Sequence, residues 1–180
     1  MKKQMSEKIE IPEGVSCSYE SGKLTCRKDS AELSREIKIP QTQVKVGNNE
    51  IVLQCGKGSK NQYKIIKSNI AHIKNMFLGL QDKFVYELEA VSVHFPMTLK
   101  AEGDKLTIGN FLGEKTPRHA KILANVEVEI KGQKIKVSSS DREAAGQTAA
   151  NLEKAAKLKG RDRRIFQDGI FIVEKPRRKS

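Results

Sequence analysis

Apolar and polar residues alternate along several stretches in both halves of the chain. A period of two positions is typical of antiparallel strands that bury one face and expose the other. The apolar members of the clearest runs are Val15, Cys17, Tyr19, Leu24, Cys26, Val44, Val46, Val126, Val128 and Ile130. Glycine-containing turns interrupt two runs, so we expect strand pairs at residues 43–54 and 125–137, which turn at residues 47–49 and 131–133.

Two other stretches have the period of a helix rather than that of a strand. Between residues 60 and 78 the apolar positions form one stripe, made of Tyr63, Ile66, Ile70, Ile73 and Phe77. Between residues 142 and 159 the stripe is mostly alanine, at Ala145, Ala149, Leu152 and Ala156. We therefore predict two helices, the second lying close to the surface that it covers, with C-terminal caps at Gly79 and Gly160.

These strands and helices occur twice in the same order. Lys23-Leu24-Thr25 and Lys105-Leu106-Thr107 each follow a turn, and each is followed by a strand pair and one helix. The pattern predicts an α+β fold with two tandem copies of a small domain, each with antiparallel β-sheets packed against one α-helix. Because the alternation changes phase near Ala90, we expect an N-terminal repeat at residues 1–90 and a C-terminal repeat at residues 91–180.

Composition narrows the class of protein. Hydrophobic residues make up 37% of the 180 positions, which argues against wholesale disorder. No apolar run approaches the roughly 20 residues needed to cross a bilayer, so we expect no membrane partner. The polar start of the chain and the odd number of cysteines (Cys17, Cys26 and Cys55) favour reduced thiols in a cytoplasmic protein. No metal-ligand spacing connects these cysteines, so we expect no metal and no other cofactor.

The formal net charge is +12, and it is unevenly distributed. Residues 1–90 contain 15 basic and 11 acidic residues, whereas residues 91–180 contain 19 and 11. The last thirty residues alone contain 10 basic and four acidic residues. Lysine- and arginine-rich surfaces bind nucleic-acid phosphates by releasing counterions. The charge therefore favours an RNA partner, and plain solubility is the alternative explanation.

Two loop-like basic stretches and the C-terminal tail contain the candidate RNA contacts. The candidates are Lys115, Arg118 and Lys121 in the first stretch, Lys159, Arg161, Arg163 and Arg164 in the second, and Lys175, Arg177, Arg178 and Lys179 in the tail. A turn at Asp168-Gly169 and a last strand at residues 170–173, which can be buried on both faces, separate the second stretch from the tail. Since aromatic residues are only 5% of the chain, we expect recognition of RNA backbone and shape to dominate.

Catalytic signals are weak. The three histidines are His72, His94 and His119, and no serine lies in a nucleophile motif such as G-x-S-x-G. Residues 56–60 lack the spacing of a phosphate-binding loop and are better explained as the start of a helix. We therefore expect no enzyme. The alternative is an RNA-cleaving site that uses His119.

Three features resemble the large-subunit ribosomal protein numbered six in the universal scheme, in its archaeal and eukaryotic form: the duplicated halves, Asn-Phe-Leu-Gly-Glu-Lys at residues 110–115, and the arginine, Asp-Gly and lysine pattern of residues 161–175. The resemblance implies a non-enzymatic component of the large ribosomal subunit that binds large-subunit rRNA mainly through its C-terminal half. It also implies a position near the factor-binding region and the sarcin–ricin loop, beside other ribosomal proteins, with translation factors as further candidate partners. By position, the implied rRNA contacts are Arg161, Arg163, Arg164 and Lys175. A free RNA-binding regulator remains the alternative.

Overall fold

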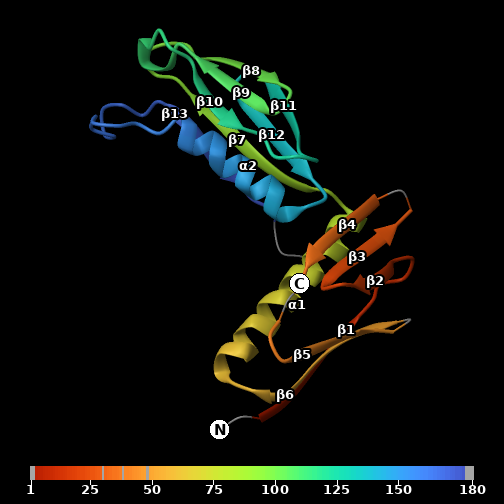
Figure 1. Cartoon of the computed structure of the whole chain (residues 1–180). Coiled ribbons are helices and arrows are strands. Elements are labelled where there is room, and N and C mark those ends of the chain that lie inside the picture. Colours follow the sequence, from red (N-terminus) through yellow and green to blue (C-terminus); the bar gives the residue numbers. More distant parts are fainter. Residues whose placement is uncertain (1–2, 30, 38, 48, 177–180) are drawn as a thin grey trace. The chain divides into compact units, whose positions relative to one another are not determined.

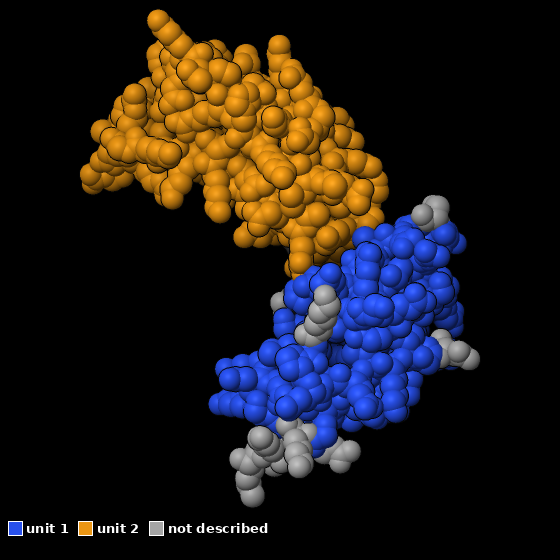
Figure 2. Space-filling model, viewed as in Figure 1, with its two compact units in different colours: residues 1–82 blue, residues 83–180 orange. Residues whose placement is uncertain are grey.

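The computed structural model describes residues 3–29, 31–37, 39–47 and 49–176. The chain divides into two compact units, residues 1–82 and residues 83–180, which Figure 2 shows in different colours. The division therefore falls eight residues before the boundary expected at residue 90. The reason is strand β7 (Phe84–Val91), which pairs with two other strands inside the second unit.

The described part of the first unit contains two antiparallel three-stranded sheets and one helix (Figure 1). The strand orders are β1-β6-β5 and β2-β3-β4, and the helix α1 packs against β3, β4 and β6. The elements are β1 (Lys3–Glu10), β2 (Ser16–Glu20), β3 (Lys23–Lys28), β4 (Ala31–Glu36), β5 (Thr42–Val46), β6 (Glu50–Gly58) and α1 (Lys60–Gln81).

The described part of the second unit has the same parts with one strand added. The strand orders are β10-β9-β8 and β11-β12-β7-β13, and the helix α2 packs against β10, β12, β7 and β13. Its remaining elements are β8 (Thr98–Glu102), β9 (Lys105–Gly109), the 3-10 turn η1 (Phe111–Gly113), β10 (Arg118–Lys121), β11 (Glu127–Lys131), β12 (Lys134–Ser139), α2 (Arg142–Ala155) and β13 (Gly169–Glu174).

The predicted duplication is confirmed. The order β11-β12-β7 repeats β5-β6-β1, and β10-β9-β8 repeats β4-β3-β2. The two Lys-Leu-Thr triplets open β3 and β9, the central strands of equivalent sheets, and Leu24 and Leu106 are both fully buried. Strand β13 has no counterpart among the described residues of the first unit. The second unit is thus a copy of the first, extended at one sheet edge.

Each unit has its own hydrophobic core. The alanine stripe of α2 is confirmed, because Ala145, Ala149, Leu152 and Ala156 are all buried. Small residues let this helix approach β7 closely: a Cβ atom added at Gly146 would lie 2.9 Å from the hydroxyl of Tyr86. On α1 the stripe is narrower than predicted, since Tyr63 is 42% exposed.

Both helices begin as capping chemistry dictates but end elsewhere than expected. Ser59 and Gln62 form a reciprocal capping box at the start of α1, and Asp141 accepts a hydrogen bond from the Glu143 amide at the start of α2. The predicted caps at Gly79 and Gly160 are wrong. Helix α1 continues through a buried Gly79 to Gln81, because the packed face continues, and α2 ends at Ala155.

Strand β13 is an edge strand, and it is not buried on both faces. Ile170 is buried, but Phe171 is 43% and Val173 66% exposed. A run of apolar residues shows hydrophobicity but not how many strands flank it, and among the described residues only β7 pairs with β13.

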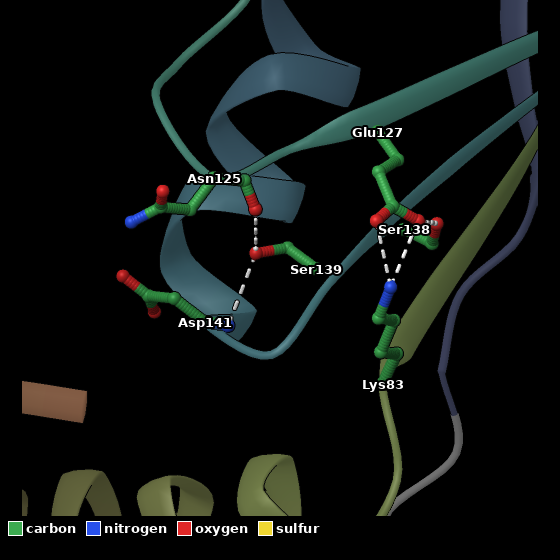
Figure 3. Close-up of polar contacts among 6 residues, drawn as sticks. All are labelled: Lys83, Asn125, Glu127, Ser138, Ser139 and Asp141. Carbon is green, nitrogen blue, oxygen red and sulfur yellow. Dashed lines mark hydrogen bonds and ion pairs between the residues drawn. The ribbon is translucent and has the colours of Figure 1, made fainter. Parts of the chain in front are cut away.

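Polar contacts join the strands of the second unit to the start of α2 (Figure 3). The Lys83 ammonium donates to both carboxylate oxygens of Glu127, at 2.7 and 2.9 Å. The buried Ser139 hydroxyl donates to the Asn125 carbonyl at 2.7 Å and accepts from the Asp141 amide at 3.1 Å. A buried hydroxyl with both roles filled carries no desolvation penalty, and it fixes the turn into the helix.

The position of β7 leads to a test of the boundary. We expect a fragment of residues 83–180 to unfold cooperatively on heating, and a fragment of residues 91–180 to show no cooperative transition, because removing β7 separates β12 from β13. Thermal unfolding followed by circular dichroism measures both, with residues 1–82 as the companion fragment. A cooperative transition in residues 91–180 would contradict the boundary at residue 83.

Candidate nucleic-acid interface

The loop between α2 and β13 (residues 157–168) is anchored at its end by Asp168 (Figure 1). This side chain is buried, and its Oδ1 accepts hydrogen bonds from the amides of Val93 (2.8 Å) and His94 (3.1 Å). Its Oδ2 lies 2.7 Å from Nδ1 of the His94 ring. The residue that the sequence marked only as part of a turn therefore ties the loop to the segment that follows β7.

Asp168 stays ionised in this position. Burial, the largest influence on its pKa, favours the protonated form. The hydrogen bonds from the His94 ring and from the His94 and Val93 amides outweigh burial and lower the pKa of Asp168. The anchor is therefore a charge-assisted one at neutral pH.

An aromatic ring positions the first arginine of the loop. The Phe166 ring stacks on the His94 ring with centroids 4.8 Å apart, and Arg161 Cζ lies 4.7 Å from the Phe166 centroid. Cation–π contact of this kind holds a guanidinium without using its hydrogen-bond donors. Arg161 is thus oriented and still able to donate to a phosphate.

Arg164 has a weaker internal partner. Its guanidinium lies 2.8 Å from a carboxylate oxygen of Asp162, and its amide donates to the same carboxylate at 2.9 Å. The Arg164 side chain is 89% exposed, so this ion pair is screened by water and can exchange for another anion. Arg163, between the two other arginines, is also exposed.

The Arg118 guanidinium contacts groups of the protein itself. This guanidinium lies 2.6 Å from Glu114 and donates to the carbonyls of Ala155 (3.1 Å) and Lys157 (2.9 Å). It also lies over the ring of the buried Phe111, at 4.2 Å. Arg118 therefore satisfies carbonyls left open at the end of α2 and ties the first basic stretch to the second.

The two stretches form one charged surface. The pKa of Glu114 is lowered mainly by its hydrogen bond with Arg118, against the effect of burial, and also by the charges of Arg161 and Lys159. Arg118 bonds both Glu114 and the Lys157 carbonyl, so the chain beside Lys115 lies close to the start of the second stretch. We call Lys115, Lys159, Arg161, Arg163 and Arg164 the basic surface; all five are exposed.

The other predicted contacts are more scattered. Lys121 lies on the exposed side of β10 and Lys175 just beyond β13, each with an exposed side chain. Arg177, Arg178 and Lys179 lie outside the described residues. With the units divided after residue 82, the first has 14 basic and nine acidic residues and the second 20 and 13. The contrast between halves is small, so the local arrangement and not the total charge marks the site.

His119, the residue of the alternative catalytic hypothesis, has a hydroxyl neighbour: its Nδ1 lies 3.2 Å from Thr107 Oγ1. Within the described ranges, no three His, Cys, Asp or Glu side chains are arranged to hold a metal ion. A search of the same residues finds no helix with the length and apolar character that spanning a membrane requires.

Sequence comparisons address the same region. A family model described as ribosomal protein L6 matches residues 95–169, which include both basic stretches. The chain is 42% identical to the large ribosomal subunit protein uL6 of Methanococcus vannielii over 169 residues, covering 94% of this chain and 93% of that protein. It is also 42% identical to the protein of the same name from Methanosarcina mazei over 175 residues, covering 97% and 99%.

The anchor of the loop can be tested through stability. We expect Asp168→Asn to lower the free energy of unfolding by about 1–3 kcal/mol, the cost of weakening buried hydrogen bonds. The pKa of Asp168 is lowered on folding, so its contribution is complete above the ordinary aspartate pKa of about 3.9 and is lost as pH falls through the folded value.

Denaturant unfolding of wild type and Asp168→Asn between pH 7 and pH 3 measures both effects. The difference between the two proteins should shrink toward the acid end. Asp162→Asn, at an exposed carboxylate of the same loop, is the control and should change stability little. A constant difference between wild type and Asp168→Asn at every pH would contradict the anchoring role of the charge.

Proposed function

Because the chain belongs to the ribosomal protein L6 family, we propose that it is a structural constituent of the large ribosomal subunit and supports translation there. Its second unit binds large-subunit rRNA near the factor-binding and sarcin–ricin region. Neighbouring ribosomal proteins are further partners, and translation factors are candidates for contact. In this role the protein works in the cytoplasm, without catalysis.

The observation that carries the proposal is the construction of the basic surface. Arg118 joins two loops that are separated by strands and by α2, and Asp168 fixes the second loop to the segment after β7; the polar groups of both residues are used within the protein. The remaining cations face outward on a frame that is already fixed. Binding RNA then releases counterions at a small cost in side-chain and loop ordering.

The residues divide into two roles. Lys115, Lys159, Arg161, Arg163 and Arg164 neutralise phosphates, with Lys121, Lys175 and the tail residues Arg177, Arg178 and Lys179 as additional contacts. Arg118 was expected to be such a contact, but its engaged donors make it a positioning residue in this proposal. Arginine suits the contact role because its planar guanidinium can donate two parallel hydrogen bonds to a phosphate.

The proposal predicts the salt dependence of binding. Changing Arg161, Arg163 and Arg164 together to alanine should weaken binding to a large-subunit rRNA transcript. The slope of log affinity against log salt should fall by roughly 0.7–0.9 for each lost phosphate contact. The matched control changes Lys60, Lys64 and Lys74, three exposed lysines of α1, and should leave affinity and slope nearly unchanged. Equal slopes in wild type and the arginine variant would refute the role of the loop.

The ribosomal location has its own test. In cell extract the protein should sediment with large subunits in high salt, and the arginine variant should be released at lower salt. Sedimentation separates a ribosomal constituent from a free RNA-binding regulator. Absence of the wild-type protein from the large-subunit fraction would exclude the first.

A further inference from the structure

A cavity of about 420 Å³ lies beside the C-terminal end of α2, in the second unit. The end of α2, the loop of residues 157–168 and β13 form its walls. The lining residues that matter here are Lys154, Lys157, Leu158, Arg163, Phe166 and Phe171. Ligand pockets in proteins commonly enclose about 300–1,000 Å³, so this cavity can hold a group of small-molecule size.

Phe171 gives one wall of the cavity a flat apolar surface. Its ring lies over Gly169: a Cβ atom added there would be 2.9 Å from Phe171 Cζ and 3.1 Å from Cε2. Only a glycine leaves room for the ring in this position. The Phe171 side chain is 43% exposed and so is not packed into the hydrophobic core. An aromatic ring therefore lies against the glycine at the edge of the cavity and is only partly covered.

The charges around this ring are mainly positive. Lys154, Lys157 and Arg163 line the cavity and are exposed. Of the two acidic lining residues, Asp168 is already engaged by the Val93 and His94 amides and the His94 ring, which leaves Glu153. Arg163 also belongs to the basic surface, so the cavity is continuous with the proposed rRNA interface.

We propose that this cavity receives one unstacked base of the bound RNA. The base lies against Phe171 and Leu158, and Arg163 and Lys157 reach the flanking phosphates. Unpaired RNA bases commonly stack on aromatic side chains, and cations beside the ring suit the phosphates on either side of such a base. The inference rests on the proposed function and adds base stacking to the backbone recognition expected from the low aromatic content.

The full-length protein tests the proposal with a uridine-rich single-stranded RNA carrying one 2-aminopurine, an adenine analogue whose fluorescence falls when it stacks. Wild type should bind and quench the probe. Phe171→Leu keeps an apolar side chain without the ring, and should lose most of the quenching and about tenfold in affinity. Phe171→Tyr should retain both. Val173→Ala, at an exposed apolar position of the same strand, is the control for altered surface hydrophobicity.

A second variant separates this inference from the proposed function. Lys159→Ala with Arg164→Ala removes two charges of the basic surface that do not line the cavity. It should weaken binding and its salt dependence while leaving the quenching at saturation unchanged. If this variant weakens binding and Phe171→Leu does not alter quenching, the cavity proposal is wrong and the basic surface stands. If Phe171→Leu alone lowers affinity and quenching, the cavity proposal stands and the basic surface is wrong.

Two further outcomes would overturn the cavity proposal. One is the absence of quenching by wild type at saturating RNA. The other is a Phe171→Leu variant that binds and quenches normally but is lost from large subunits, which would indicate an apolar side chain of a neighbouring protein as the occupant. Thermal unfolding of each variant, with Phe171→Tyr as the conservative substitution, distinguishes loss of stacking from loss of fold.

Discussion

The arrangement of the proposed RNA-binding surface in the second unit depends on a single buried carboxylate. Asp168 accepts two backbone hydrogen bonds and contacts the His94 ring, and these contacts span 74 and 75 positions of sequence. An unpaired charge at such a depth would be strongly unfavourable, so the segments that supply its partners must stay together. The consequence is geometric: once His94 is fixed, Phe166 stacks on it and Arg161 on Phe166.

Arg118 fixes the other end of the same loop, at Lys157. It joins the carbonyls at the end of α2 to Glu114, so the hydrogen-bond donors of this arginine are used within the protein. A preorganised surface needs some cations that bond to the protein and fix the loops, and others that stay exposed and can bind a ligand. A flexible loop with the same composition would have the same charge, but it would lose more conformational entropy on binding.

Local patterns predicted the local structure well. Alternation located the strands and the helical stripes located α1 and α2, because both depend on neighbours a few positions apart. The repeated Lys-Leu-Thr triplets revealed the duplication, because the two halves use the same residues at equivalent positions. The errors concern which strands pair with one another. The phase change near Ala90 suggested a boundary, but β7 keeps Leu88 and Ala90 in the core because β12 and β13 flank it.

The arrangement of the basic stretches could be predicted only in part, for the same reason. Charge and arginine content identified the two stretches, yet a sequence does not show which cations are already engaged, so Arg118 looked equivalent to Arg161. Asp168 was interpreted as a turn residue, since Asp-Gly is a common turn. The available signal was an acidic residue between two apolar positions, Phe166 and Ile170, where burial would require a carboxylate to have hydrogen-bond partners.

The added strand β13 affects the order of assembly as the chain is synthesised. The first unit has all its strands and its helix once residue 82 is made, and most of its pairings connect neighbouring segments. In the second unit β7 must wait for β13, and the loop before β13 stays open until Asp168 reaches the segment after β7. Long-range pairing of this kind is slow. The surface that we propose to bind RNA therefore cannot take its final shape until the segment that contains Asp168 and β13 has been made.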